Sequence, residues 1–141
     1  MSLHFTAEEL LSFMEGVFPQ VQGLYAIEML SEQEVHVRLR VSDMHLRPGG
    51  TVSGPSMFSL ADISAYLMVL AHIGPEALAV TTNCSIDFMR KPEAGQDLIS
   101  RCSLLKLGKV LAVTDVHIFS QGEDRPVARA SLTYSIPKKG S

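Results

Sequence analysis

Residues 56–73 constrain the fold most, because they read as a helix that is apolar almost all round and carries one formal charge, Asp62. A helix without a polar face must be covered on most of its surface, and a twisted antiparallel sheet curling round it would do this. A charge in such a helix is costly unless a partner satisfies it, so Asp62 needs either a structural or a chemical reason. A stripe of small or flexible residues would let the sheet approach closely: Ala61, Ser64, Ala65, Met68 and Ala71.

Periodicity along the rest of the chain predicts the elements that surround this helix. Thr6 and Glu9 have the spacing of a capping box, and helical periodicity follows until Pro19, which predicts a short amphipathic helix near the N-terminus. Apolar runs and clean alternation, separated by turn residues, predict strands in antiparallel order. The predicted strands are residues 24–30, 34–41, 79–88, 97–107, 110–120 and 127–136.

Composition places residues 1–141 in one domain that can bury a single core. With 19% charged residues and a net charge of -3, the chain lacks the basic excess that nucleic acid binding needs. Cys84 and Cys102 stand in no metal-binding or redox spacing, so we expect reduced cysteines, no metal and a cytoplasmic protein. The longest uncharged run, from Asp62 to Glu76, predicts a core helix and no membrane span.

The glycine-rich residues 49–55 lie directly before the long helix. A helix start leaves about four backbone N–H groups unpaired, and glycine lets a ligand oxygen approach them. A carboxylate and amide donors together suit hydrolysis, since one activates water and the other stabilises an oxyanion. The simpler interpretations are a structural carboxylate at Asp62 and a turn glycine at Gly54.

The order of elements resembles the hot-dog fold, an α+β fold in which a curved antiparallel sheet wraps a long central helix; here a short N-terminal helix is added. Residues 52–62 resemble the PaaI-like acyl-CoA thioesterase family, in which a His-Gly-Gly loop precedes a helix with an acidic residue eight positions after the first glycine. Residues 81–92 and 128–134 are similar to strands of that family. Ser53 and Pro55 depart from it, since they replace the histidine and the second glycine.

The resemblance implies roles for three residues. Asp62 would be the general base or the nucleophile, and the Gly54 N–H would be the oxyanion donor. The water-orienting hydroxyl of the family maps to Thr82, with Thr81 as the near alternative. Strand parity with Cys84 favours Thr82, because it predicts that the Thr82 hydroxyl points toward the helix.

Other residues are candidates for substrate binding. His45, in the loop before the glycines, could hold the substrate carbonyl, and Arg47 lies near a position that is polar in the family. Ser53 and Pro55 belong to the same loop. Basic residues at strand ends and a hairpin tip would suit the phosphates of CoA, although solvated turn residues explain them equally: Arg90, Lys91, Lys106 and Lys109.

The implied function is hydrolysis of an acyl-CoA thioester, or an acyl-ACP thioester, without a cofactor. Two alternatives stay open: a 3-hydroxyacyl thioester dehydratase that uses His45 and Asp62, and a non-catalytic acyl-CoA-binding module. Gly54 and Asp62 are eight residues apart, which is about 12 Å along a helix, too far for one carbonyl to touch both. We therefore expect an obligate homodimer, or a homotetramer, in which two antiparallel helices bring these groups together.

Overall fold

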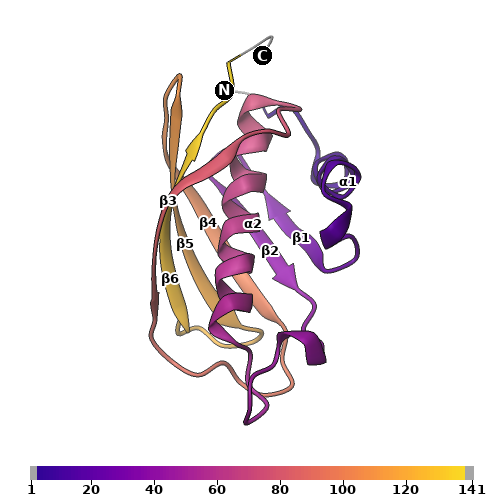
Figure 1. Cartoon of the computed structure of the whole chain (residues 1–141), viewed down its shortest axis with the longest axis vertical. Coiled ribbons are helices and arrows are strands. Elements are labelled where there is room, and N and C mark those ends of the chain that lie inside the picture. The colour runs from indigo at the N-terminus through magenta and orange to yellow at the C-terminus, as the bar shows by residue number, and fades with distance from the viewer. Residues whose placement is uncertain (1–2, 139–141) are drawn as a thin grey trace.

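A computed structural model describes residues 3–138 of the chain. Across these residues one curved antiparallel sheet wraps around a long helix, with strand order β1-β2-β4-β5-β6-β3 (Figure 1). This is the hot-dog arrangement that the order of elements predicted, and the strand bounds differ from the predicted ones by no more than two residues. The strands are β1 (Tyr25–Leu30), β2 (Glu34–Leu39), β3 (Val80–Phe88), β4 (Leu98–Leu107), β5 (Leu111–Ser120) and β6 (Ala128–Ser135).

The N-terminal helix α1 (Ala7–Val17) begins at the predicted capping box. The Thr6 N–H donates to the Glu9 carboxylate at 2.8 Å, and the Glu9 N–H donates to the Thr6 hydroxyl at 3.2 Å. Leu10 and Met14 are fully buried, so α1 lies along the side of the central helix and β1 (Figure 1). Two short 3-10 helices, η1 (Pro19–Val21) and η2 (Asp43–His45), complete the path to the glycine loop.

The central helix α2 (Gly54–Ile73) starts two residues earlier than periodicity predicted, because Ser53 caps it. Its small-residue stripe is fully buried against the sheet, as predicted. The buried Ser64 hydroxyl is satisfied by the Leu60 carbonyl at 2.6 Å and by the Ser100 hydroxyl at 2.5 Å. By length and composition α2 could cross a bilayer, but 72% of its most apolar 18-residue window is buried inside the protein, which is the behaviour of a core helix.

Alternation along the strands decides which side chains meet α2. Alternation in residues 34–41 predicts one inward face of Val35, Val37, Leu39 and Val41. The first three are fully buried in β2, whereas Val41 lies beyond the end of the strand and is half-buried. In β3 the alternation is broken by a bulge between Thr81 and Asn83, where the pairing register with β6 shifts by one residue. Within residues 3–138, β3 pairs only with β6, so its other edge is unpaired.

Candidate active site

The Asp62 carboxylate is held in place by hydroxyl groups from two neighbouring strands. Its Oδ1 accepts a hydrogen bond from the Thr81 hydroxyl of β3 at 2.5 Å and another from the Tyr134 hydroxyl of β6 at 2.7 Å. The Tyr134 hydroxyl also lies 3.1 Å from the Asp62 carbonyl oxygen. Both hydrogen bonds therefore converge on one carboxylate oxygen, while Oδ2 has no hydrogen-bond partner among the described residues.

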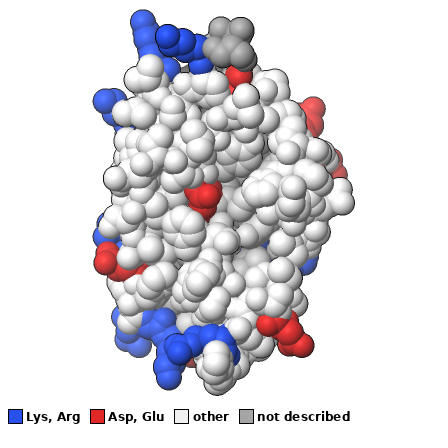
Figure 2. Space-filling view, in the orientation of Figure 1, with Lys and Arg blue, Asp and Glu red and all other residues white. Residues whose placement is uncertain are grey.

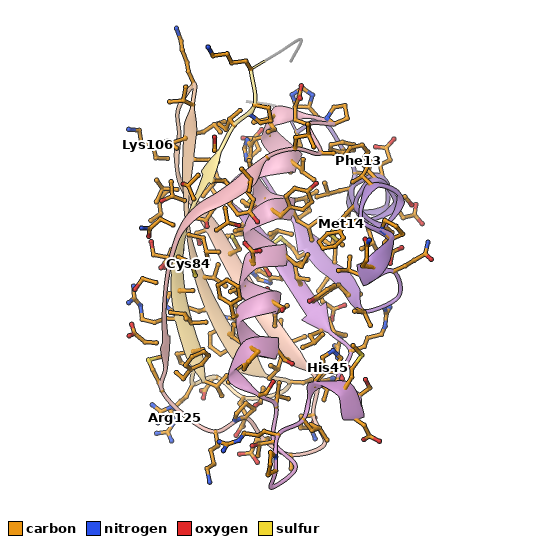
Figure 3. The ribbon with its side chains drawn as sticks, viewed as in Figure 1. Phe13, Met14, His45, Cys84, Lys106 and Arg125 are labelled. Atoms are coloured by element: carbon orange, nitrogen blue, oxygen red, sulfur yellow. The ribbon has the colours of Figure 1, made fainter. Side chains whose placement is uncertain are left out.

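Thr82 does not face Asp62, and the orientation expected from strand parity is wrong. Its side chain is exposed, and its hydroxyl donates to the Thr133 carbonyl at 3.2 Å. The bulge between Thr81 and Asn83 explains the difference, because the extra residue exchanges the two faces of the strand. Thr81, the near alternative, occupies the inward position together with Cys84, which lies on the middle of β3 (Figure 3).

The acidic proton of each phenol or thiol near Asp62 is held more tightly than usual. Burial raises the pKa of Tyr134, and the negative charge of Asp62 raises it further. Burial and the same charge raise the pKa of Tyr25 to about 12, and they also raise the pKa of Cys84. These groups therefore remain protonated at neutral pH and can act as hydrogen-bond donors beside a carboxylate.

Asp62 lies between two pockets that share Phe18 and Ile63. Figure 2 shows one acidic group near the centre of the face over α2, surrounded by uncharged surface, with the other charged groups toward the edges. The only carboxylate of α2 is that of Asp62. The first pocket measures about 240 Å³ and is also lined by Val17, Tyr66, Ala77, Ala79, Val80, Thr81 and Tyr134. The second measures about 260 Å³ and is also lined by Val21, Leu24, Tyr25, Met44, His45, Ser56, Phe58 and Ser59.

Gly54 occupies the first position of α2, and its N–H makes no hydrogen bond within residues 3–138. A side chain here would be crowded, since a Cβ atom would lie 3.3 Å from the Phe88 ring. Ser53 is half-buried, and its hydroxyl accepts from the Ser56 N–H at 3.3 Å and donates to the Ser56 hydroxyl at 3.0 Å. The Ser53 hydroxyl thus serves the helix cap, and Pro55 beside it is exposed.

Gly54 and Asp62 line different pockets of the chain. The Gly54 pocket measures about 420 Å³, and its lining includes Phe88 but not Asp62. Three of the predicted substrate-binding residues gather there, and each is basic and exposed: Arg47, Arg90 and Lys91.

The other basic candidates lie at the far end of α2. Figure 3 shows Lys106 at the upper end of the molecule and His45 at the lower end. Lys109 lines a separate pocket of about 320 Å³ with His72 and Ile73, at the C-terminal end of the helix. Within one chain the basic candidates therefore form two separate groups, because the topology places the β4–β5 hairpin tip opposite the glycine loop.

His45 is buried and shares a pocket with Asp62. Its Nδ1 accepts a hydrogen bond from the Ser42 N–H at 2.9 Å. Since Nδ1 is the acceptor, the ring proton resides on Nε2, which has no partner among the described residues. His45 can therefore present a hydrogen-bond donor to a ligand in that pocket.

Tyr134 is the site residue that reasoning from sequence missed. A signal was present, because Ala128, Ala130, Leu132 and Tyr134 alternate on the inward face of β6. A tyrosine on a core face brings a hydroxyl that needs a partner. The charged residue of the helix that packs on this face is the natural acceptor.

Comparisons with known proteins agree with this architecture. Residues 49–127 match the description of the thioesterase superfamily. Human acyl-coenzyme A thioesterase 13 is 26% identical over 117 residues, which are 82% of this chain and 82% of that protein.

Two solved structures show how closely the fold agrees. A protein from Silicibacter sp. TM1040 assigned as a thioesterase is 59% identical with a TM-score of 0.92, covering 98% of this chain and 96% of that one. The PaaI protein of the E. coli phenylacetic acid degradation operon is 25% identical with a TM-score of 0.81, covering 97% of each chain. The chain therefore belongs to the thioesterase superfamily and is a thioester hydrolase with the hot-dog fold.

Proposed function

We propose that the protein hydrolyses an acyl-CoA thioester to a free acid and CoA, with Asp62 as general base or nucleophile. The observation that carries this proposal is a carboxylate anchored through Oδ1, with Oδ2 left without a protein partner beside two pockets. The acyl-coenzyme A thioesterase named among the relatives supports the choice of CoA as carrier.

In the general-base route, Oδ2 of Asp62 takes a proton from water while the water oxygen bonds to the thioester carbonyl carbon. The carbonyl oxygen becomes an oxyanion, which accepts a hydrogen bond from a Gly54 N–H. When the carbon–sulfur bond breaks, the thiolate of CoA takes the proton back from Asp62. In the nucleophilic route, Oδ2 attacks the carbon directly, CoA leaves, and water hydrolyses the resulting anhydride.

A single chain does not supply both halves of this site, so we propose a homodimer with two composite sites. Gly54 and Asp62 line different pockets, and eight residues of helix separate them by about 12 Å. Two α2 helices packed antiparallel would place the Gly54 end of one chain beside Asp62 of the other. The exposed apolar surface supports this arrangement, since Phe58 on α2 and Val80 and Phe88 along the unpaired β3 edge are 38%, 56% and 51% exposed.

The basic residues fit the same arrangement as binding groups for the CoA phosphates. Arg47, Arg90 and Lys91 surround the Gly54 pocket, at the start of α2. In an antiparallel pair the far end of the other helix, with Lys106 and Lys109, approaches this start. Basic residues of both chains would then surround one binding site for the CoA phosphates.

Two experiments test the proposed function. Thiol release from a panel of acyl-CoAs, run beside hydration of an enoyl-CoA, separates a thioesterase from a dehydratase and from a non-catalytic binding module. For the composite site, Asp62→Asn chains are mixed with Gly54→Val chains, each inactive alone. Hybrid dimers carry one intact site, so activity should return; a fully active monomer, or no rescue after verified subunit exchange, contradicts the composite site.

A further inference from the structure

The Tyr134 side chain connects β6 to the candidate base from a buried position. It is 3% exposed, and its hydroxyl reaches both Oδ1 and the backbone carbonyl oxygen of Asp62, at 2.7 and 3.1 Å. The ring is fixed by packing, including a tilted contact with Tyr66 at 6.1 Å between centroids. A phenol has one hydroxyl proton, and the shorter contact, to the charged carboxylate oxygen, is the stronger hydrogen bond.

We propose that Tyr134 is a positioning residue that, together with Thr81, fixes Oδ1 of Asp62 and thereby makes Oδ2 the reacting oxygen. The inference rests on the proposed function of Asp62 and deepens it. A carboxylate free to rotate would present either oxygen, in many orientations. Two donors from different strands, at 2.5 and 2.7 Å on the same oxygen, hold the carboxylate in one orientation.

Other titratable groups lie around Asp62. Among the described residues they are Tyr25 of β1, Cys84 of β3, Tyr66 of α2 itself and His45 of η2. The Tyr66 hydroxyl donates to the Ala77 carbonyl at 2.8 Å and does not contact Asp62. Tyr66 therefore offers a matched control: a second tyrosine of the same pocket, with one hydrogen bond of similar length to a different acceptor.

The test replaces Tyr134 by Phe, which keeps the ring and removes the hydroxyl. Loss of one donor lets the carboxylate rotate, so kcat should fall about tenfold with little change in KM. Thr81→Val removes the other donor and should lower kcat by a similar factor, while Thr81→Ser should restore it.

A measurement without substrate separates failure of this inference from failure of the proposed function. The NMR chemical shift of the Asp62 carboxyl carbon, assigned by its loss in Asp62→Asn, is compared at neutral pH in wild type, Tyr134→Phe, Thr81→Val and Tyr66→Phe. A changed signal in Tyr134→Phe and Thr81→Val, with no change in Tyr66→Phe, supports the clamp even if the wild type hydrolyses no acyl-CoA. An unchanged signal in folded Tyr134→Phe, or an equal change in Tyr66→Phe, overturns it; if Tyr134→Phe does not fold, Tyr134→Met takes its place.

Discussion

Replacing Asp62 by Asn should separate the chemistry of this carboxylate from its structural part. Asn has the same shape, and its amide oxygen can accept the hydrogen bonds of Thr81 and Tyr134 in place of Oδ1. It cannot take a proton from water or attack a thioester at the Oδ2 position. We therefore expect kcat for thiol release to fall at least about a hundredfold, the scale of losing a positioned base.

The cost in stability should be small by comparison. Each of the two hydrogen bonds changes from charged to neutral, a difference of about 1 kcal/mol, so the free energy of unfolding should fall by at most about 2 kcal/mol. Asp62→Ala instead leaves the Thr81 and Tyr134 hydroxyls without their acceptor and should cost about 2 to 4 kcal/mol. We therefore expect the two variants to lose a similar factor in kcat, while Asp62→Ala loses more free energy of unfolding than Asp62→Asn.

The assay combines thiol release under saturating acyl-CoA with urea unfolding of both variants. Wild-type circular dichroism and assembly size serve as controls for the fold of Asp62→Asn. If folded Asp62→Asn turns over within a few-fold of wild type, Asp62 is neither base nor nucleophile. If Asp62→Ala is no less stable than Asp62→Asn, the two hydroxyls do not depend on this acceptor.

The remaining predictions concern the second threonine, the basic rim and alkaline pH. Thr81→Val should lower kcat about tenfold because it frees Oδ1, whereas Thr82→Val should change kcat less than about threefold; equal losses in a steady-state assay would contradict this assignment. Arg90→Glu and Lys109→Glu should each raise KM with little change in kcat, and added salt should weaken substrate binding by the wild type. If the wild type hydrolyses acyl-CoA and the acyl thioester of a simple thiol with equal kinetics, these basic residues do not bind the CoA phosphates. Because the folded pKa of Tyr25 is raised from 10.0 to about 12, its contribution to stability is complete below pH 10 and is lost as pH rises toward 12. Urea unfolding should show a decline of up to about 1.4 kcal/mol per pH unit from this group, and Tyr25→Phe should flatten that decline.

The sequence was sufficient for most of the fold, because the decisive signals are local and periodic. The capping box of α1, the alternation of Val35, Val37 and Leu39, and the apolar length of α2 each specify one element and one buried face. Turn residues mark where each strand ends, but the sheet order is set by packing, since β3 lies at the edge beside β6 and β2 pairs with β4. The helix α2 begins two residues before the start that periodicity predicts, because Ser53 caps it and is not part of the loop.

The site was less predictable because it depends on register. Asp62 stood out as one charge on an apolar helix, a local signal. The choice between Thr81 and Thr82 depended on whether alternation continues without interruption, and pairing with β6 interrupts it. Tyr134 lies 72 residues from Asp62 in sequence, and only the packing of β6 on α2 brings them together.

The bulge in β3 has a consequence for comparing this chain with its relatives. A sequence alignment counts residues and treats neighbouring threonines as nearly equivalent, yet the bulge puts Thr81 against Asp62 and Thr82 on the outside. In a relative whose strand runs straight, a hydroxyl would have to move by one position to keep the same contact. An alignment that matches residue types there would then pair side chains from opposite faces of the strand. The roles of β3 residues should therefore be transferred between relatives by superposing structures and not by position in a sequence alignment.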